Sequence, residues 1–132
     1  MAVPGSSERC SPPPVSARRC VLVVDDDDDT LRAVVRLLEL HGYAAHGARG
    51  FQDAIDVWRT SGCDVLVADI ALPDGSGLDL MRLLRPSGVR GVSVSGHVDP
   101  AHLKASRDAG FSAHFVKPVR FEDLLAAVER VS

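Results

Sequence analysis

Charged residues follow directly on short apolar runs at three well-separated places in the chain. If these runs are buried parallel strands, their charges meet at one edge of a sheet, where α/β proteins bind ligands. Three carboxylates in one pocket repel one another unless a cation joins them, so the pattern predicts an oxygen-liganded metal such as Mg²⁺ beside a lysine ammonium. The runs are residues 21–24 before Asp25 and Asp26, 65–68 before Asp69, and 115–116 before Lys117 and Pro118.

The composition limits the classes of function. A chain of 132 residues fits one domain with a single core. A net charge of −3, with Arg and Asp mixed along the chain, argues against nucleic-acid binding. No apolar stretch approaches the roughly 20 residues of a membrane span, and the N-terminus lacks the apolar segment of a secretory signal, so we expect a soluble, cytoplasmic protein. Cys10, Cys20 and Cys63 lack the paired spacing of a zinc site and are expected to be free thiols.

The elements that must position the charges alternate between strands and helices. Residues 1–17 are rich in Pro and Ser and are expected to form a disordered tail. From residue 18 onward, apolar runs predict strands at about 20–24, 44–46, 64–68, 91–95 and 113–116. Helical spacing predicts helices that contain Leu31–Leu38 and Phe51–Trp58, one from about Gly77 to before Pro86, one over 100–109, and one that contains Phe121–Val131. Such alternation is typical of a parallel α/β sheet.

Three smaller expectations concern single residues. Asp28 or Asp29 is expected to cap the first helix. Trp58 is expected to lie in the core. The helix over 100–109 has Leu103 as its only large apolar residue, so it should be the least firmly packed.

Residues 18–132 resemble the receiver domain of two-component response regulators. The matching stretches are residues 21–26, 69–73 with Gly77, Ser95 with Gly96, and Lys117 with Pro118. The resemblance implies a flavodoxin-like, doubly wound five-stranded sheet of order 2-1-3-4-5 with five helices. It also implies that the Lys117–Pro118 peptide bond is cis.

The same resemblance implies a role for each matching residue. Asp69 would accept a phosphoryl group from a histidine kinase or a histidine phosphotransfer protein. Asp26 and Asp69 would ligate Mg²⁺ directly, Asp25 through water, and Ala71 through its backbone carbonyl. Ser95 and Lys117 would bind the phosphoryl oxygens, and the fourth helix, fifth strand and fifth helix would form the face that binds a partner. The protein would be a phosphoryl acceptor rather than an enzyme, with no output domain in this chain.

Two histidines depart from the receiver pattern. His114 stands three residues before Lys117, where receivers commonly carry a rotating Tyr or Phe, and an ordinary strand histidine fits this position equally well. His97 stands where the family tunes the lifetime of the acyl phosphate. On the strand before it, Ser93 alternates with Ser95, and only the family register favours Ser95.

Two other functions remain open at this level. Residues 26–30 spell the D-x-D-x-T of haloacid-dehalogenase-like phosphatases, although Asp25 separates them from the strand. A pseudo-receiver, with the same fold but no phosphorylation, would act as an adaptor and need not bind a metal. The kinase, the downstream partner and the oligomeric state do not follow from the sequence.

Overall fold

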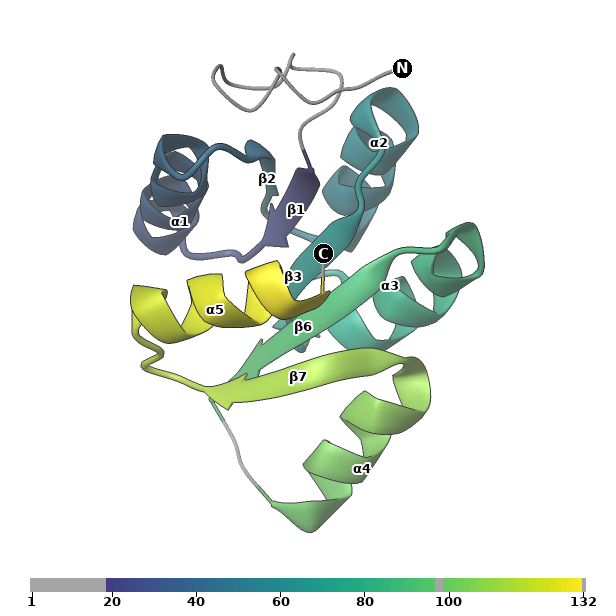
Figure 1. Ribbon diagram of the computed structural model, residues 1–132. Helices are drawn as coiled ribbons and strands as arrows, with labels where there is room; N and C mark the ends of the chain where they lie inside the picture. Colours follow the sequence, from purple (N-terminus) through teal and green to yellow (C-terminus); the bar gives the residue numbers. More distant parts are fainter. Residues whose placement is uncertain (1–18, 97–98, 132) are drawn as a thin grey trace, which may run out of the picture.

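Residues 19–96 and 99–131, which the computed structural model describes, form a parallel sheet with helices on both faces (Figure 1). The strand order is β2-β1-β3-β6-β7, which is 2-1-3-4-5 when the short β4 and β5 are set aside. The predicted fold is therefore confirmed. The tail predicted over residues 1–17 lies outside the described residues. The strands are β1 (Cys20–Val24), β2 (Ala44–Ala48), β3 (Val65–Asp69), β6 (Arg90–Ser95) and β7 (Phe111–Val116).

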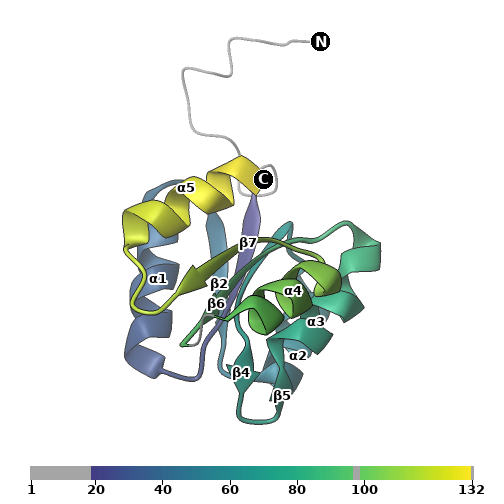
Figure 2. The same ribbon diagram turned by 90° about the horizontal axis from the view of Figure 1, so that it is seen from below.

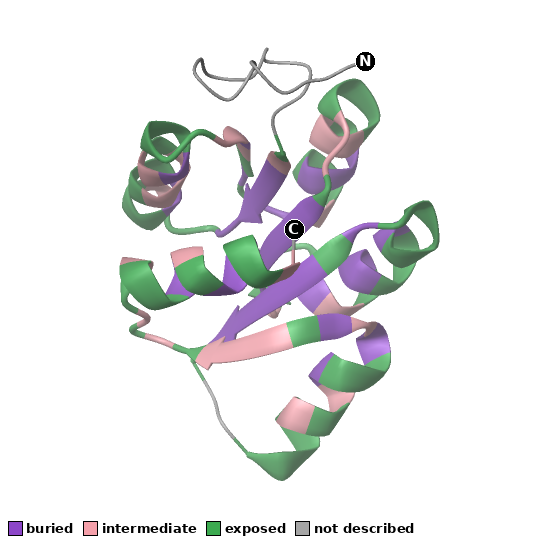
Figure 3. Ribbon diagram, viewed as in Figure 1, coloured by how far each residue is buried: buried purple, intermediate pink, exposed green. Residues whose placement is uncertain are grey.

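The two faces of the sheet carry separate apolar layers, because side chains along a strand alternate in direction. Val21 and Val23 of β1 pack in one layer, and Leu22 and Val24 pack in the other. β3 is buried at all five positions, as expected for a central strand that is covered on both faces (Figure 3). This is why the strands read as continuous apolar runs in the sequence.

Five helices cover the sheet where helical spacing predicts them. α1 and α5 lie on one face, and α2, α3 and α4 lie on the other (Figure 2). Leu31 and Leu38 anchor α1, whereas Trp58 of α2 is only partly buried, so its prediction as a core residue holds in part. None of these helices combines the length and apolar composition of a membrane span. They are α1 (Asp28–Leu40), α2 (Phe51–Ser61), α3 (Gly77–Leu84), α4 (Pro100–Ala109) and α5 (Phe121–Val131).

The prediction that Asp28 or Asp29 caps α1 is wrong. The cap position is Asp27, whose carboxylate accepts a hydrogen bond from the Thr30 hydroxyl at 2.5 Å. Asp25 accepts a hydrogen bond from the Asp27 backbone N–H at 2.9 Å. This contact turns the chain directly after β1, and the helix cap lies one residue before Asp28 and two before Asp29. Asp28 instead forms ion pairs with Arg32 and Arg49 at 3.1 and 2.6 Å.

A two-stranded antiparallel ribbon between β3 and α3, formed by β4 (Ala71–Leu72) and β5 (Gly75–Ser76), was not predicted. Asp74 in its turn accepts hydrogen bonds from the backbone N–H groups of Phe51 and Gln52 at 2.6 and 3.1 Å, and these bonds lower the pKa of Asp74. The ribbon thus caps α2 from a distant part of the chain. The run of residues 72–75, Leu-Pro-Asp-Gly, is a turn sequence that signals the ribbon.

The described cysteines are free thiols, as predicted. Cys20 and Cys63 are both partly buried and form no disulfide. Burial, with smaller effects from Cys20 and Asp64, raises the pKa of Cys63 to about 12. The thiolate is the reactive form of cysteine, so a raised pKa argues against a redox role for Cys63. Cys10 lies outside the described residues.

We expect the substitution Gly77→Ala to destabilise the protein by about 2 kcal/mol, as is common when an overpacked core is forced to shift. A Cβ at this position would overlap the backbone carbonyl oxygen of Asp69. Gly96→Ala is the control, because a Cβ there would meet nothing within 4 Å. Urea unfolding measures both variants, and a Gly77→Ala variant as stable as the wild type would contradict the packing described here.

Candidate functional site

Three carboxylates meet at the carboxyl-end edge of the sheet. Asp25 and Asp26 directly follow β1, and Asp69 ends the neighbouring strand β3. Each of the three offers a carboxylate oxygen, and these oxygens lie within 4.8 Å of one another. Asp25 and Asp69 are buried, with 6% and 9% of their surface exposed, and Asp26 is exposed. The convergence that the apolar runs predict is therefore present.

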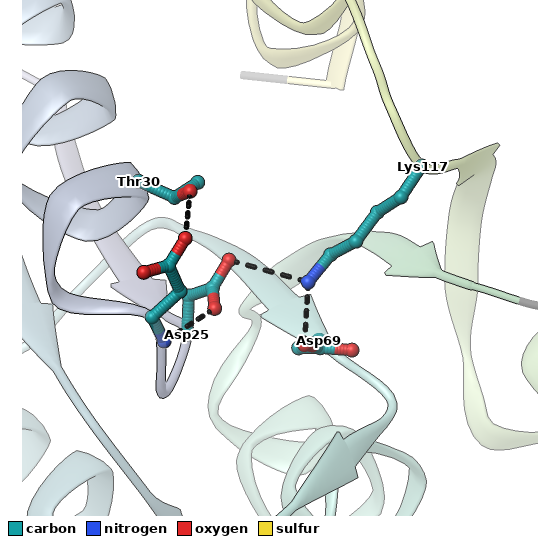
Figure 4. Close-up of polar contacts among 5 residues, drawn as sticks. Asp25, Thr30, Asp69 and Lys117 are labelled. Carbon is teal, nitrogen blue, oxygen red and sulfur yellow. Dashed lines mark hydrogen bonds and ion pairs between the residues drawn. The ribbon is translucent and has the colours of Figure 1, made fainter.

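Lys117 reaches this cluster from the end of β7, two strands away from β3 (Figure 4). Its Nζ atom donates to Asp69 Oδ2 at 2.8 Å and lies 3.5 Å from Asp25 Oδ2. The Lys117–Pro118 peptide bond is cis, as the family resemblance implied. Lys117 thus supplies a positive charge between the two buried carboxylates.

The pKa of Lys117 reflects two opposing effects. Burial alone lowers the pKa, but the hydrogen bond and charge of Asp69, joined by those of Asp25, outweigh it and raise the pKa above its ordinary value. The ammonium therefore stays charged across the physiological pH range. A charged Lys117 offsets one of the three carboxylate charges and leaves an excess of two negative charges at the cluster.

The oxygens of the buried carboxylates are unequally engaged. Asp25 uses Oδ1 to accept from the Asp27 N–H and presents Oδ2 to Lys117. Asp69 presents Oδ2 to Lys117, while its Oδ1 accepts no hydrogen bond from any described residue. One oxygen of Asp69 is thus left available for a ligand or a reaction.

Ser95 lies near the cluster by its place in the five-stranded sheet, and Ala71 lies near Asp69 in the chain. Ser95 is buried, ends β6 opposite Val116 of β7, and accepts a hydrogen bond at its carbonyl from the Lys117 N–H at 2.8 Å. Ala71 begins β4 two residues after Asp69. His97 lies outside the described residues.

The cluster opens into a cleft of about 500 Å³ between α1 and α5. Polar groups occur at the end of this cleft that contains the carboxylates. The sequence did not indicate that Asp27 and Thr30 line this cleft, because Asp27 belongs to an acidic tract that reads as a solvated helix start and Thr30 directly follows that tract. The residues that line the cleft include Val23, Asp25, Asp27, Thr30, Val34, Val67, Asp69, Lys117, Phe121 and Leu124.

Comparison with known families decides the identity of the domain. Residues 21–129 match the family described as the response regulator receiver domain. The chain belongs to this family. The match spans β1 to α5 and so includes every residue of the acidic cluster of the receiver.

Individual relatives agree with the family. The receiver is 37% identical over 101 residues to the response regulator protein TmoT of Ectopseudomonas mendocina, covering 74% of this chain and 44% of that protein. It is 41% identical over 71 residues to the response regulator protein TodT of Pseudomonas putida, covering 52% of this chain and 31% of that protein. The chain therefore spans less than half the length of each of these relatives.

Solved structures show the same architecture. The receiver superposes on a CheY-like response regulator receiver domain protein from Methanospirillum hungatei with a TM-score of 0.79 and 29% identity, covering 86% of this chain and 93% of that one. The chemotaxis response regulator CheY4 of Vibrio cholerae gives a TM-score of 0.80 at 22% identity, covering 88% of this chain and all of that one, and supports the fold.

We expect Lys117→Met to destabilise the metal-free receiver by about 1 to 2 kcal/mol, less than for a fully buried pair because 36% of the lysine side chain is exposed. Removal of the ammonium leaves the buried carboxylates of Asp25 and Asp69 without a partner cation. Thermal unfolding in EDTA measures the loss, and added Mg²⁺ should restore part of it. Lys104→Met, which removes an exposed lysine of α4, is the control. Equal stability of the two variants in EDTA would contradict the electrostatic account.

Proposed function

We propose that Asp69 accepts a phosphoryl group from a histidine kinase or a histidine phosphotransfer protein in a cytoplasmic two-component system. The observation that carries the proposal is the position of Asp69, which is buried among two other carboxylates with its Oδ2 on Lys117 and its Oδ1 available. The membership of the receiver family supports the histidine-containing donor.

The donor set of the acidic cluster suits a magnesium ion. Three carboxylates with oxygens within 4.8 Å are hard ligands of the kind Mg²⁺ prefers, and a divalent ion would balance the excess of two negative charges left beside Lys117. We assign direct contacts to Asp26 and Asp69, a contact through water to Asp25, and a backbone contact to the carbonyl of Ala71. When bound, the ion would neutralise charge on the phosphoryl oxygens.

The proposed reaction is a displacement at phosphorus. Asp69 Oδ1 forms a bond to phosphorus as the bond from phosphorus to the donor nitrogen breaks, and the electron pair leaves with the imidazole. A carboxylate is a weak nucleophile, so most of the catalysis must come from positioning and from charge neutralisation. Lys117 holds Asp69 in place and contributes a positive charge beside the reacting group.

Phosphorylation changes the charge at the site. Conversion of the Asp69 carboxylate to an acyl phosphate replaces one negative charge by about two near neutral pH. We propose that the Ser95 hydroxyl and the Lys117 ammonium bind the added phosphoryl oxygens. The movement of Ser95 would then reach the surface formed by α4, β7 and α5, where a protein partner binds.

Two alternatives are disfavoured by particular residues. For a haloacid-dehalogenase-like phosphatase, the D-x-D-x-T residues would have to share one site, yet Asp28 of α1 is paired with Arg32 of the same helix and with Arg49, which follows β2. A pseudo-receiver would be expected to lack part of the acidic cluster, whereas Asp25, Asp26, Asp69 and Lys117 are all present and close together.

Incubation with acetyl phosphate and Mg²⁺ should add one phosphoryl group to the wild type, measured as a gain in intact mass. The gain should disappear in Asp69→Asn and in EDTA, and it should persist in Asp56→Asn, which alters an exposed aspartate of α2. Absence of labelling in the wild type would favour a pseudo-receiver. Continuous hydrolysis of an added phosphomonoester would favour a phosphatase.

Calorimetric titration with Mg²⁺ tests the metal site separately. We expect Asp26→Asn to weaken Mg²⁺ binding at least about tenfold, because loss of a direct ligand should cost no less than the loss of a supporting residue. Asp29→Asn, in the same acidic tract but on α1, should leave the affinity nearly unchanged. Similar affinities for the two variants would argue against a site built on Asp26.

A further inference from the structure

Helix α4 is attached to the sheet mainly by its C-terminal half. Its buried residues are Ser106 and Ala109, whereas residues 100–102 at its start are exposed (Figure 3). Leu103 is only partly buried, so none of the large apolar side chains on α4 is fully buried. The fully buried Leu38 anchors α1, whereas no large apolar residue anchors α4 in this way.

A buried chain of hydrogen bonds joins α4 to two strands instead. The hydroxyls of Ser106 on α4 and Ser93 on β6 lie 2.8 Å apart, and Ser93 Oγ lies 2.6 Å from His114 Nδ1 on β7. Ser93 and Ser106 are 0% and 1% exposed. Hydroxyls both donate and accept, so the chain can be satisfied by either imidazole tautomer. Hydrogen bonds in such a water-excluded place are strong and costly to break.

These buried hydrogen bonds lie close to Ser95, the residue at the end of β6 beside the proposed phosphoryl-accepting site. Ser93 and Ser95 are two residues apart on β6 and therefore project from the same face of the sheet. The register places Ser93 opposite His114 and Ser95 opposite Val116, which precedes Lys117. The N-terminal end of α4 follows Ser95 after a short connection, whereas Ser106 lies in the other half of the helix.

We propose that Ser106, Ser93 and His114 form a polar latch that fixes the C-terminal half of α4, so that the helix pivots near Ser106 when the site changes state. Ser93 and Ser106 act as positioning residues, since they touch neither the acidic cluster nor Lys117 among the described contacts. The latch belongs to the unmodified protein. The pivoting rests on the proposed function, because it needs a phosphorylated state.

Space beside the latch is available for such a movement. A cavity of about 230 Å³ lies between α4 and β7, and it is lined by Leu103, Ser106, Arg107, Phe111, Ser112 and His114. The partly buried Leu103 sits one helical turn before Ser106. It can enter this cavity or leave it as the N-terminal half of α4 tilts. A pivot would therefore change the exposure of Leu103 on the surface formed by α4, β7 and α5.

Amide hydrogen exchange along α4 tests the latch in the unmodified protein. In the wild type, the amides of residues 107–110 should exchange more slowly than those of 103–105. Ser106→Ala and His114→Phe should speed exchange at 107–110 about tenfold, the effect of losing one buried hydrogen bond. Ser106→Thr keeps the hydroxyl and should stay close to the wild type, and Ser112→Ala, an exposed serine of β7, is the matched control. Equal exchange in both halves of α4, or equal effects of Ser106→Ala and Ser112→Ala, would overturn the latch.

The same experiment with Mg²⁺ and beryllofluoride, a mimic of the phosphoryl group, tests the pivot. The change in exchange should be confined to the amides of residues 101–105 in the wild type and should extend through residue 110 in Ser106→Ala. A change spread evenly over α4 in the wild type would overturn the pivot.

The rate at which acetyl phosphate labels Asp69 should be equal in Ser106→Ala and the wild type, which separates the proposed function from the latch. If the wild type is not labelled, the proposed function fails, while exchange in the unmodified protein still decides the latch.

Discussion

Repulsion among three carboxylates at one edge of the sheet is the constraint on which the rest of this site depends. Two of them are buried, where charges are expensive unless they are paired. The neighbouring positions of β1 and β3 force Asp25 and Asp69 together, and Lys117 meets both from across the sheet. One ammonium offsets one charge of three. The remaining excess makes the site suited to a divalent cation and to a reaction that delivers further negative charge.

The scaffold accounts for how such an unfavourable cluster is held. Strands β1 and β3 are buried along nearly their whole length, so the residues at their ends cannot move apart without disturbing both apolar layers. Gly77 lets α3 begin directly against the backbone of Asp69, and the ribbon before it caps α2 through Asp74. Packing in the body of the domain thus stabilises an arrangement that its own electrostatics oppose.

Helix α4 differs from the other helices in how it is held. α1 and α5 bury large apolar residues such as Leu38 and Val128, whereas α4 buries a serine and an alanine. Its position is set by a few directional contacts rather than by a broad apolar stripe. Because these contacts hold only the C-terminal half of α4, the N-terminal half can change its orientation without breaking them, which suits a surface that must report the state of a nearby site.

The alternation of strands and helices and the acidic cluster could be predicted from local patterns in the sequence, whereas the sheet order followed from the resemblance to receiver domains. Apolar runs identify buried strands, and parallel strands bring their ends together whatever the length of chain between them. The cap of α1 and the link from Asp74 to α2 were missed, because each depends on a contact that no spacing rule encodes. Ser93 appeared only as an alternative to Ser95, since its partners Ser106 and His114 come from different elements.

Borohydride reduction followed by peptide sequencing by mass spectrometry tests the central claim most directly, because it converts an aspartyl phosphate to homoserine at the residue that carried it. After incubation with acetyl phosphate and Mg²⁺, homoserine should appear at position 69 and should be absent when EDTA replaces the metal. Homoserine at another aspartate, or the same yield at position 69 with and without Mg²⁺, would contradict the account of a metal-dependent acceptor built on Asp69.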